Sequence, residues 1–426
     1  MNSRVIRVKA RFAGWCVLAC LSVNALPTQA QQTNRVDADQ IPRVFLLDAT
    51  RLAAARVAIN KDEKDIEPAW EKLRRDAEKT LAAGPFSIVN KPVTPPSRDK
   101  HDYMSQAPYF WPDPNKQNGL PYIRRDGERN PEINKITDHK SLDDLVSSVE
   151  TLALAYYFKA DEAYAARAVQ LLRAFFLDPV TRMNPNLQYA QFIPGVNTGR
   201  GIGLIETRGL TRVVDAVGLL AGSKSLTAQD ERGLKDWFAQ FLQWMQESKN
   251  GREESAAKNN HGTWYDVQVV SFALFLGKID FAKRTLETAK QKRIATQIEP
   301  DGRQPLELVR TKAWGYSNGN LDGLMQLATL GERIGVDLWT FQTKDGRSIR
   351  KALDFLTPVA LGERKWQYQE LDGVKPESLF PLMRRAAAIY RDKTYQTVMA
   401  KVPDVTSSDR SRLLSPDTNH GKQAHR

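Results

Sequence analysis

SLDDLVSSVETLALAYYFKADEAYAARAVQLLRAFF, residues 141–176, has the apolar spacing of two helices joined by a short polar break. In its first half, apolar residues recur at intervals of three and four, from Leu142 through Leu152 to Tyr156. After the KADEA break, residues 166–176 repeat this pattern. The stretch therefore predicts an antiparallel helical hairpin.

Similar helix pairs follow this hairpin along the chain. They are expected at 204–221 with 227–248, 264–276 with 279–293, and 320–335 with 347–361, and a last helix is expected at 376–399. Few runs alternate with the period of two that is typical of half-buried strands. Hairpins that cannot bury their apolar faces alone must stack on their neighbours. We therefore predict an all-α protein whose stacked antiparallel hairpins form an arc or a closing ring.

The N-terminus has the layout of a secretory signal peptide. A cationic start and the apolar run FAGWCVLACLSVNAL precede PTQAQQ, which predicts cleavage after about Ala30. A lipoprotein signal at Cys20 is the alternative, although Leu18 fits that pattern poorly. We expect a signal peptide at 1–30, one folded domain at 31–400, and a polar disordered tail at 401–426. The mature protein is expected to be periplasmic or secreted.

The charge of the chain favours an anionic partner. The formal net charge is +12, and this excess suits an acidic polysaccharide, although a basic soluble surface is an alternative explanation. No block of Lys and Arg with interleaved aromatics points to nucleic acid. After the signal segment, no apolar run is long enough to span a membrane. Both a monomer and a dimer are compatible with the sequence.

Residues 91–138 are rich in Pro, Gly and Asp, and cannot form regular helix for long. This long loop also carries many aromatic residues, whose exposed faces can stack on sugar rings. The alternative is that these side chains pin the loop onto the helical body. The candidates for substrate binding in this loop are His101, Tyr103, Tyr109 and Trp111.

Two polar and aromatic clusters precede apolar helical runs. KNNHGTWYD, residues 258–266, follows a charged stretch that is expected to be mobile, and its two asparagines can cap a helix. LVRTKAWGYSNGNLDG, residues 308–323, contains Arg310 and Tyr316 before a helix that is expected to begin near Leu321. In stacked hairpins, the starts of alternating helices meet at one end of the structure. We therefore expect the two clusters to share a cleft.

Several kinds of site are excluded by their missing motifs. No pair of histidines has metal-ligand spacing, and HExxH, GxSxG and Walker motifs are absent, so neither a metal nor a cofactor is expected. An oxygen-ligated calcium site stays open. The glycines of GRGIGLIE, residues 199–206, lie in helical surroundings, so a phosphate loop is disfavoured. Glu206 and Arg208 are expected to pair with each other or to reach the cleft, and His139 to be a capping or surface residue.

The two clusters together resemble the alginate-lyase-like polysaccharide lyases. The match rests on NNHGTW, on GYSNGNL with an arginine six residues before its tyrosine, and on DYMSQAPYFWPDP and LDPVTRMNPNLQYAQFIPG. It covers roughly residues 45–390. The resemblance implies an exported enzyme with an incomplete (α/α) toroid and a lid loop. It also implies β-elimination from a 1,4-linked uronan, either alginate or glucuronan.

The resemblance further implies roles for individual residues. Tyr316 would be the acid, and also the base where H5 and O4 lie on one face of the sugar, as in β-mannuronate and β-glucuronate. His261 would be the base for guluronate, or would hold the carboxylate. Arg310 would lower the pKa of Tyr316 and bind substrate, and Asn260 and Asn197 compete as the residue that neutralises the carboxylate. Further substrate contacts are expected from Arg208, Trp264 and Trp314.

Two other functional classes stay open from the sequence. A glycoside hydrolase on a similar toroid would need two carboxylates roughly 5 to 10 Å apart. Only Asp266 and Asp322 lie near the two clusters, and both fall inside predicted helices. A non-catalytic binding protein for an acidic glycan would keep the aromatic loop, but would have no reason to combine Tyr316 with Arg310 and His261.

Overall fold

The computed structural model describes residues 41–414. The hairpin expected at 141–176 is confirmed, and its elements are α3 (Asp138–Lys159), α4 (Glu162–Leu172) and the π-helical turn η3 (Arg173–Leu177). Asp161 caps α4, because its side chain accepts a hydrogen bond from the Ala163 amide at 2.9 Å. All of residues 151–158 in α3 are buried, so this helix is an interior element.

The other expected hairpins are also present. They are α5 (Leu210–Leu219) with α6 (Ala228–Glu247), α8 (Asn260–Phe275) with α9 (Ile279–Ala289), and α12 (Ala313–Glu332) with α13 (Ile349–Ala360). Residues expected to begin the α5 helix form the separate 3-10 helix η4 (Gly201–Thr207). The helix expected at 376–399 is divided into η6 (Pro376–Leu379), α14 (Phe380–Tyr390) and α15 (Lys393–Met399). Arg391 has a φ of 51°, which ends α14 in a left-handed turn.

Several short elements have no counterpart in the sequence prediction. They are α1 (Ala49–Asn60), α2 (Glu67–Thr80), η2 (Pro131–Lys135), α7 (Lys249–Ala256), α10 (Ala295–Gln297), α11 (Pro305–Leu308) and α16 (Ser411–Leu414). The π-helical η5 (Lys290–Ile294) continues α9 within the helix expected at 279–293. The helix α16 packs on α1 and α2, and Leu413 is fully buried there. The disorder expected from residue 401 is therefore wrong for residues 411–414. The expected signal peptide, and residues 415–426, lie outside the described residues.

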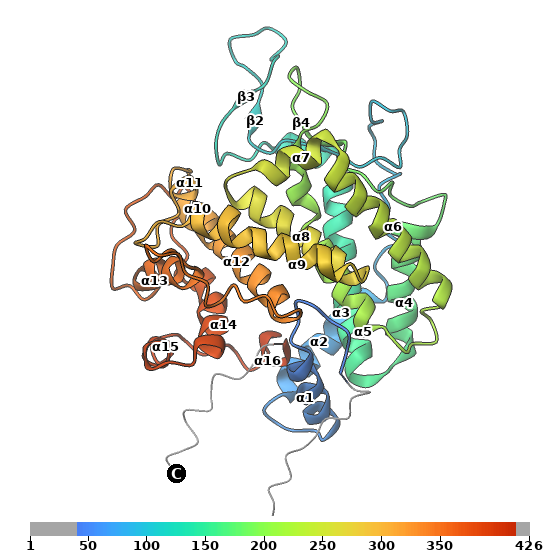
Figure 1. The fold of residues 1–426 in the computed structure, drawn as a ribbon. Helices are drawn as coiled ribbons and strands as arrows, with labels where there is room; N and C mark the ends of the chain where they lie inside the picture. Colours follow the sequence, from blue (N-terminus) through green and yellow to red (C-terminus); the bar gives the residue numbers. More distant parts are fainter. Residues whose placement is uncertain (1–40, 415–426) are drawn as a thin grey trace, which may run out of the picture.

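The helical hairpins build an (α/α) toroid, as predicted. The inner helices α3, α5, α8 and α12 contact one another in chain order. Each of α3, α8 and α12 packs against the helix that follows it in its own hairpin, whereas α6 packs on η3 and α8. Figure 1 shows this succession from the green α3 to the orange α12. At the base of the toroid, Asp215 of α5 accepts hydrogen bonds from the amides of Phe45, Leu46 and Leu47. Within the described part of the chain, no helix has the length and apolarity needed to cross a membrane.

Short strands gather at the end of the toroid where α8 and α12 begin. The strands β1 (Met104–Gln106) and β4 (Tyr189–Phe192) pair in parallel with an irregular register, and β2 (Phe110–Trp111) pairs antiparallel with β3 (Ile123–Arg124). Figure 1 shows β2, β3 and β4 above the helices. Lys91 and Asp138 form a fully buried ion pair at 3.0 Å, and Asp138 also accepts from the Met104 amide at 2.9 Å. These bonds fix β1 to the start of α3.

Candidate active site

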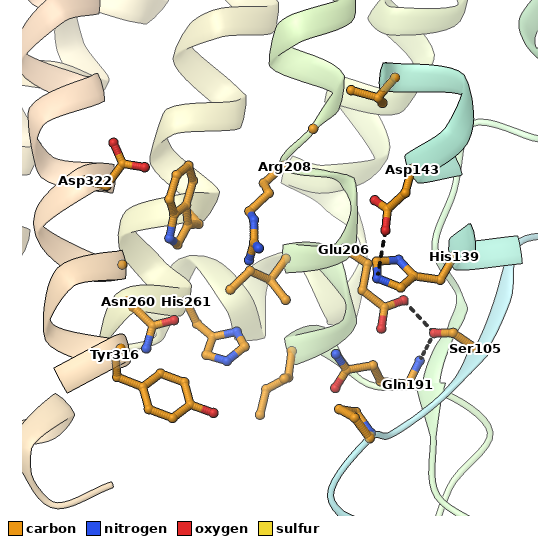
Figure 2. A pocket seen from close by; sticks show the side chains of 18 of the residues that line it. Ser105, His139, Asp143, Gln191, Glu206, Arg208, Asn260, His261, Tyr316 and Asp322 are labelled. Atoms are coloured by element: carbon orange, nitrogen blue, oxygen red, sulfur yellow. Dashed lines mark hydrogen bonds and ion pairs between the residues drawn. The ribbon is translucent and has the colours of Figure 1, made fainter. Parts of the chain in front are cut away.

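A cavity of about 1850 Å³ opens among the inner helices at this end of the toroid. Its walls come from the starts of α3, α8 and α12, from η4, and from the loop that contains β2 and β3. Four of the five predicted catalytic residues line it, namely Tyr316, His261, Arg310 and Asn260. Figure 2 shows His261 and Asn260 beside Tyr316, on one side of the cavity. The expected shared cleft is therefore confirmed.

Tyr316 lies in the first turn of α12 and is held by two other side chains. Arg310 donates from Nη2 to the Tyr316 hydroxyl at 2.8 Å, and its guanidinium lies 3.8 Å from the centre of the tyrosine ring. The Tyr316 hydroxyl in turn donates to that of Tyr109 at 3.1 Å. A hydrogen bond thus joins Tyr316 of the helical body to Tyr109 of the aromatic loop.

Asp126 fixes the position of Arg310. Its carboxylate accepts from Arg310 Nε at 3.0 Å and from Nη2 at 2.7 Å, which is the two-point geometry that arginine favours. It also accepts from the Thr311 amide at 3.3 Å. These donors hold the pKa of Asp126 well below its usual range despite partial burial. The loop thereby supplies both Tyr109 and the carboxylate that orients Arg310.

The environment of Tyr316 keeps its phenol neutral. Burial raises its pKa above the ordinary value of 10.0, and the hydrogen bond and charge of Tyr109 act in the same direction. Arg310 lowers the pKa, as predicted, but its influence is smaller than that of burial. Tyr316 is therefore a proton donor in the unliganded site, and Arg310 is the group that favours its phenolate.

His261 is oriented by Glu254, a residue of α7. The imidazole Nδ1 lies 2.7 Å from Glu254 Oε1, and only 1% of the Glu254 side chain is exposed. An ionised carboxylate only accepts hydrogen bonds, so Nδ1 carries the hydrogen. In the neutral ring, Nε2 is then left to accept a proton or to bind a ligand. The stretch that precedes His261 is thus an ordered helix rather than the expected mobile segment.

Asn260 is bound to a second buried carboxylate. Glu307 of α11 accepts from the Asn260 backbone amide at 2.6 Å and from its side-chain nitrogen at 2.7 Å. The side-chain nitrogen has a second hydrogen, which can be donated to a ligand. The side chain of the N-cap residue, Asn259, makes no capping hydrogen bond to α8. The capping role expected for Asn259 and Asn260 is therefore wrong, because Glu307 takes the first free amide.

The opposite wall is formed by β1, β4 and η4. Glu206 accepts from Tyr103 Oη at 2.8 Å and from Ser105 Oγ at 2.6 Å, so it does not form the expected pair with Arg208. Arg208 lines the cavity and lies 5.5 Å from the centre of a Trp264 ring, which also lines it. His139 lines the cavity too, with Nε2 3.5 Å from Asp143 Oδ2, rather than acting as a cap. Figure 2 shows this wall facing Tyr316.

The remaining predicted site residues do not line the cavity. The side chain of Asn197 accepts from the Ile193 amide at 3.1 Å and closes a turn, which leaves Asn260 as the candidate for carboxylate neutralisation. Tyr103 is fully buried, and the ring of Trp314 is bound to Lys375 and Ser378. His101 bonds to the Arg182 carbonyl and Trp111 to that of Glu128, so both anchor the loop. Among the aromatic-loop candidates, only Tyr109 reaches the cavity.

The donors of this cavity suit an anionic ligand and proton transfer. Tyr316 and His261 are candidate proton carriers, while Arg310 and Asn260 can donate to a carboxylate. Within residues 41–414, no cluster of three or more His, Cys, Asp or Glu side chains has the arrangement of a metal site.

Comparison with known proteins identifies the family. A family model described as alginate lyase matches residues 87–366, which is more than half of the chain. The chain belongs to the alginate lyase family. It is therefore a polysaccharide lyase, and its substrate is a polysaccharide.

Solved structures of other lyases resemble this one. An alginate lyase from Bacteroides ovatus is 42% identical, with a TM-score of 0.84, over 88% of this chain and 99% of that one. Alginate lyase A1-III from Sphingomonas species A1 has 15% identity and a TM-score of 0.55, over 87% of this chain and 95% of that one. At that identity the likeness shows the fold alone. No curated protein matches the chain.

Proposed function

We propose that this polysaccharide lyase cleaves a 1,4-linked uronan, either alginate rich in mannuronate or glucuronan, by β-elimination. The observation that carries the proposal is the hydrogen-bonded series from Asp126 through Arg310 to Tyr316, placed beside His261 and Asn260 in one cavity. The alginate lyase of Bacteroides ovatus supports the choice of a uronan.

The proposed elimination moves one proton between two positions of the sugar. Asn260 donates the free hydrogen of its side-chain nitrogen to the C6 carboxylate, and His261 in its doubly protonated form donates from Nε2. These donors bind the negative charge that develops on the carboxylate, which makes H5 more acidic. When substrate binds, the phenol of Tyr316 releases its proton to solvent, and Arg310 stabilises the phenolate. The phenolate takes H5, and the C5–H electrons form the C4–C5 double bond. The C4–O4 bond breaks, and the proton passes from Tyr316 to O4. One residue can serve both steps because H5 and O4 lie on the same face in mannuronate and glucuronate.

Guluronate requires a different base. Its H5 lies on the face opposite O4, so the residue that protonates O4 cannot also remove H5. His261 Nε2 is available for this step because Glu254 occupies Nδ1. We propose that guluronate, where it is cleaved, uses His261 as base and Tyr316 as acid.

The proposed function is tested by mixing the purified enzyme separately with polymannuronate, polyguluronate and glucuronan. Elimination creates a C4–C5 double bond that absorbs in the ultraviolet, so rising absorbance identifies both the reaction and the preferred sugar. New reducing ends without this absorbance would indicate a hydrolase instead. We also propose that no metal takes part, so prior treatment with a chelator is expected to leave the rate unchanged. Loss of activity that added cation restores would contradict this.

We propose two further properties. The first is export, for which the support is the signal-peptide layout of residues 1–30; recovery of the protein only from the cytoplasm of its source would contradict it. The second is that residues 98–125 close over the substrate as a lid, supported by the place of Tyr109 and Phe110 in the cavity wall. Protease sensitivity of the loop is expected to fall when an oligosaccharide is bound. An unchanged sensitivity would contradict closure.

A further inference from the structure

The glycine motif GRGIGLIE, residues 199–206, places Arg200 in the cavity wall. The motif runs along β4, and its glycines allow the two backbone segments to approach closely. A Cβ atom at Gly199 would lie 2.0 Å from the Gln188 carbonyl oxygen, and one at Gly203 would lie 2.5 Å from Ala190 Cβ. Only glycine fits at such distances. Arg200, between these glycines, donates its backbone amide to the Ala190 carbonyl at 3.1 Å and is thereby fixed beside β4.

The neighbour of Arg200 on β4 has an unusual backbone. Gln191 has a φ of 50°, in the left-handed region, at the point where the register between β1 and β4 is irregular. Its amide donates to Ser105 Oγ at 2.8 Å. Its side chain accepts from Arg200 Nη2 at 2.8 Å. Strained residues of this kind concentrate at functional sites, and here the strained residue orients a cation that lines the cavity.

The guanidinium of Arg200 has no carboxylate partner among the described residues. It lies 5.1 Å from the centre of the Phe110 ring, and its Nε is buried without a hydrogen-bond partner. Burial lowers its pKa to about 10, although the charges of Glu206 and Glu254 oppose that shift. By contrast, Arg310 and Arg212 each pair with a carboxylate. Because Nη2 is bonded to Gln191 and Nε is enclosed, Nη1 is the donor that the half-buried guanidinium can offer to an incoming anion.

We propose that Arg200 binds the carboxylate of the sugar next to the one undergoing elimination, so that the enzyme requires two consecutive uronates. The inference rests on the proposed function. Asn260 and His261 serve the reacting sugar from the α8 wall, whereas Arg200 belongs to the β4 and η4 wall. A guanidinium matches a carboxylate in shape and charge, and an uncharged sugar would leave it unpaired.

The test compares Arg200→Gln and Arg200→Lys with the wild-type enzyme. Arg303→Gln is the matched control, because Arg303 is an exposed arginine paired with Asp301 outside the cavity. Calorimetry measures the binding of a fully charged oligomannuronate and of one in which alternate carboxylates are methyl esters. Kinetics on polymannuronate separate KM from kcat. Thermal unfolding of each variant shows whether its fold is intact.

For Arg200→Gln, the Kd of the charged ligand and KM are expected to rise at least about tenfold, the usual effect of losing a charged hydrogen bond. The kcat stays close to that of the wild type, binding of the esterified ligand changes little, and Arg200→Lys retains part of the affinity. An unchanged Kd overturns the inference. So does a fall in kcat alone, or an equal loss of both ligands with a lower melting temperature, which indicates a structural role.

Failure of the proposed function gives a different result. If the wild-type enzyme binds the charged ligand but forms no double bond, elimination is wrong, and the calorimetric comparison still tests Arg200. If the wild-type enzyme binds neither ligand, both the inference and the proposed function are overturned.

Discussion

The two walls of the cavity treat their charged groups in opposite ways. On the α8 and α12 wall, buried or half-buried carboxylates hold the functional side chains: Asp126 binds Arg310, Glu254 binds His261, and Glu307 binds Asn260. On the β4 and η4 wall, Arg200 and Arg208 lie over aromatic rings and have no carboxylate partner within residues 41–414. The first wall holds its functional side chains in fixed orientations, and the second leaves two cations available to bind an anionic ligand.

This difference matches two tasks of a lyase. Proton transfer requires reacting groups that are held at fixed positions, since a small misplacement has a large cost in rate. Binding an anionic polymer requires cations whose attraction is not already satisfied within the protein. The comparison therefore predicts that changes on the first wall alter kcat, while changes on the second wall alter KM.

The largest effect on kcat is expected from replacing Arg310, compared with replacing Arg364, another arginine that stacks on an aromatic ring. Arg310→Met removes the donor to Tyr316 and should lower kcat by about 10²- to 10³-fold, as for other preorganised donors. Steady-state kinetics on the preferred polymer provide the measurement. Arg364→Met is the control, because Arg364 stacks on Phe355 outside the cavity. A rise in KM with unchanged kcat would place Arg310 with the binding wall instead.

A smaller loss is expected from Glu254→Gln. The amide can no longer hold His261 through a charged hydrogen bond, so misorientation of the ring should lower kcat on the order of 10²-fold or less. Glu253→Gln on the same helix is the matched control, since that side chain is 49% exposed and pairs with Lys249. Equal activity of the two variants would show that Glu254 does not position His261.

Arg208→Met should affect binding rather than chemistry. Its loss is expected to raise KM about tenfold with kcat nearly unchanged, because the guanidinium forms no hydrogen bond to the catalytic wall. The same kinetic assay measures both constants, and Arg364→Met again serves as the control. A fall in kcat at constant KM would contradict the claim that the β4 and η4 wall acts in binding alone.

The smallest effect is expected in the pH titration of the free enzyme. Because burial raises the pKa of Tyr316 above 10.0, its phenol stays protonated at a pH where an ordinary tyrosine has begun to ionise. Ultraviolet titration of wild type and Tyr316→Phe should therefore coincide below pH 10. An additional ionisation in the wild type below that value would show that Arg310 outweighs burial.

The sequence was sufficient to predict the hairpins and the meeting of His261 with Tyr316. Both follow from local patterns, namely the apolar spacing of 141–176 and two polar clusters that each precede an apolar helix. Stacking of the hairpins then brings the helix starts together. The family motifs point to the same residues.

The carboxylates behind the catalytic wall were not predictable in this way. Glu254 lies in a charged run with no apolar pattern, and Asp126 lies in a polar turn. Only tertiary packing brings Asp126 to Arg310, across 184 residues of sequence. The same limit explains why Tyr103 and Trp111 were wrongly expected to contact substrate. They lie in a loop whose composition is typical of sugar binding, but their polar atoms bond to Glu206 and to the Glu128 carbonyl.

The most direct test of the two-wall account is Tyr316→Phe, measured for both turnover and binding of the same oligomannuronate. The substitution removes the hydroxyl bound by Arg310 and Tyr109, and keeps the ring. The account predicts that formation of the double bond is abolished while the Kd stays close to that of the wild type. Retained turnover, or an equal loss of turnover and binding in a folded variant, would contradict it.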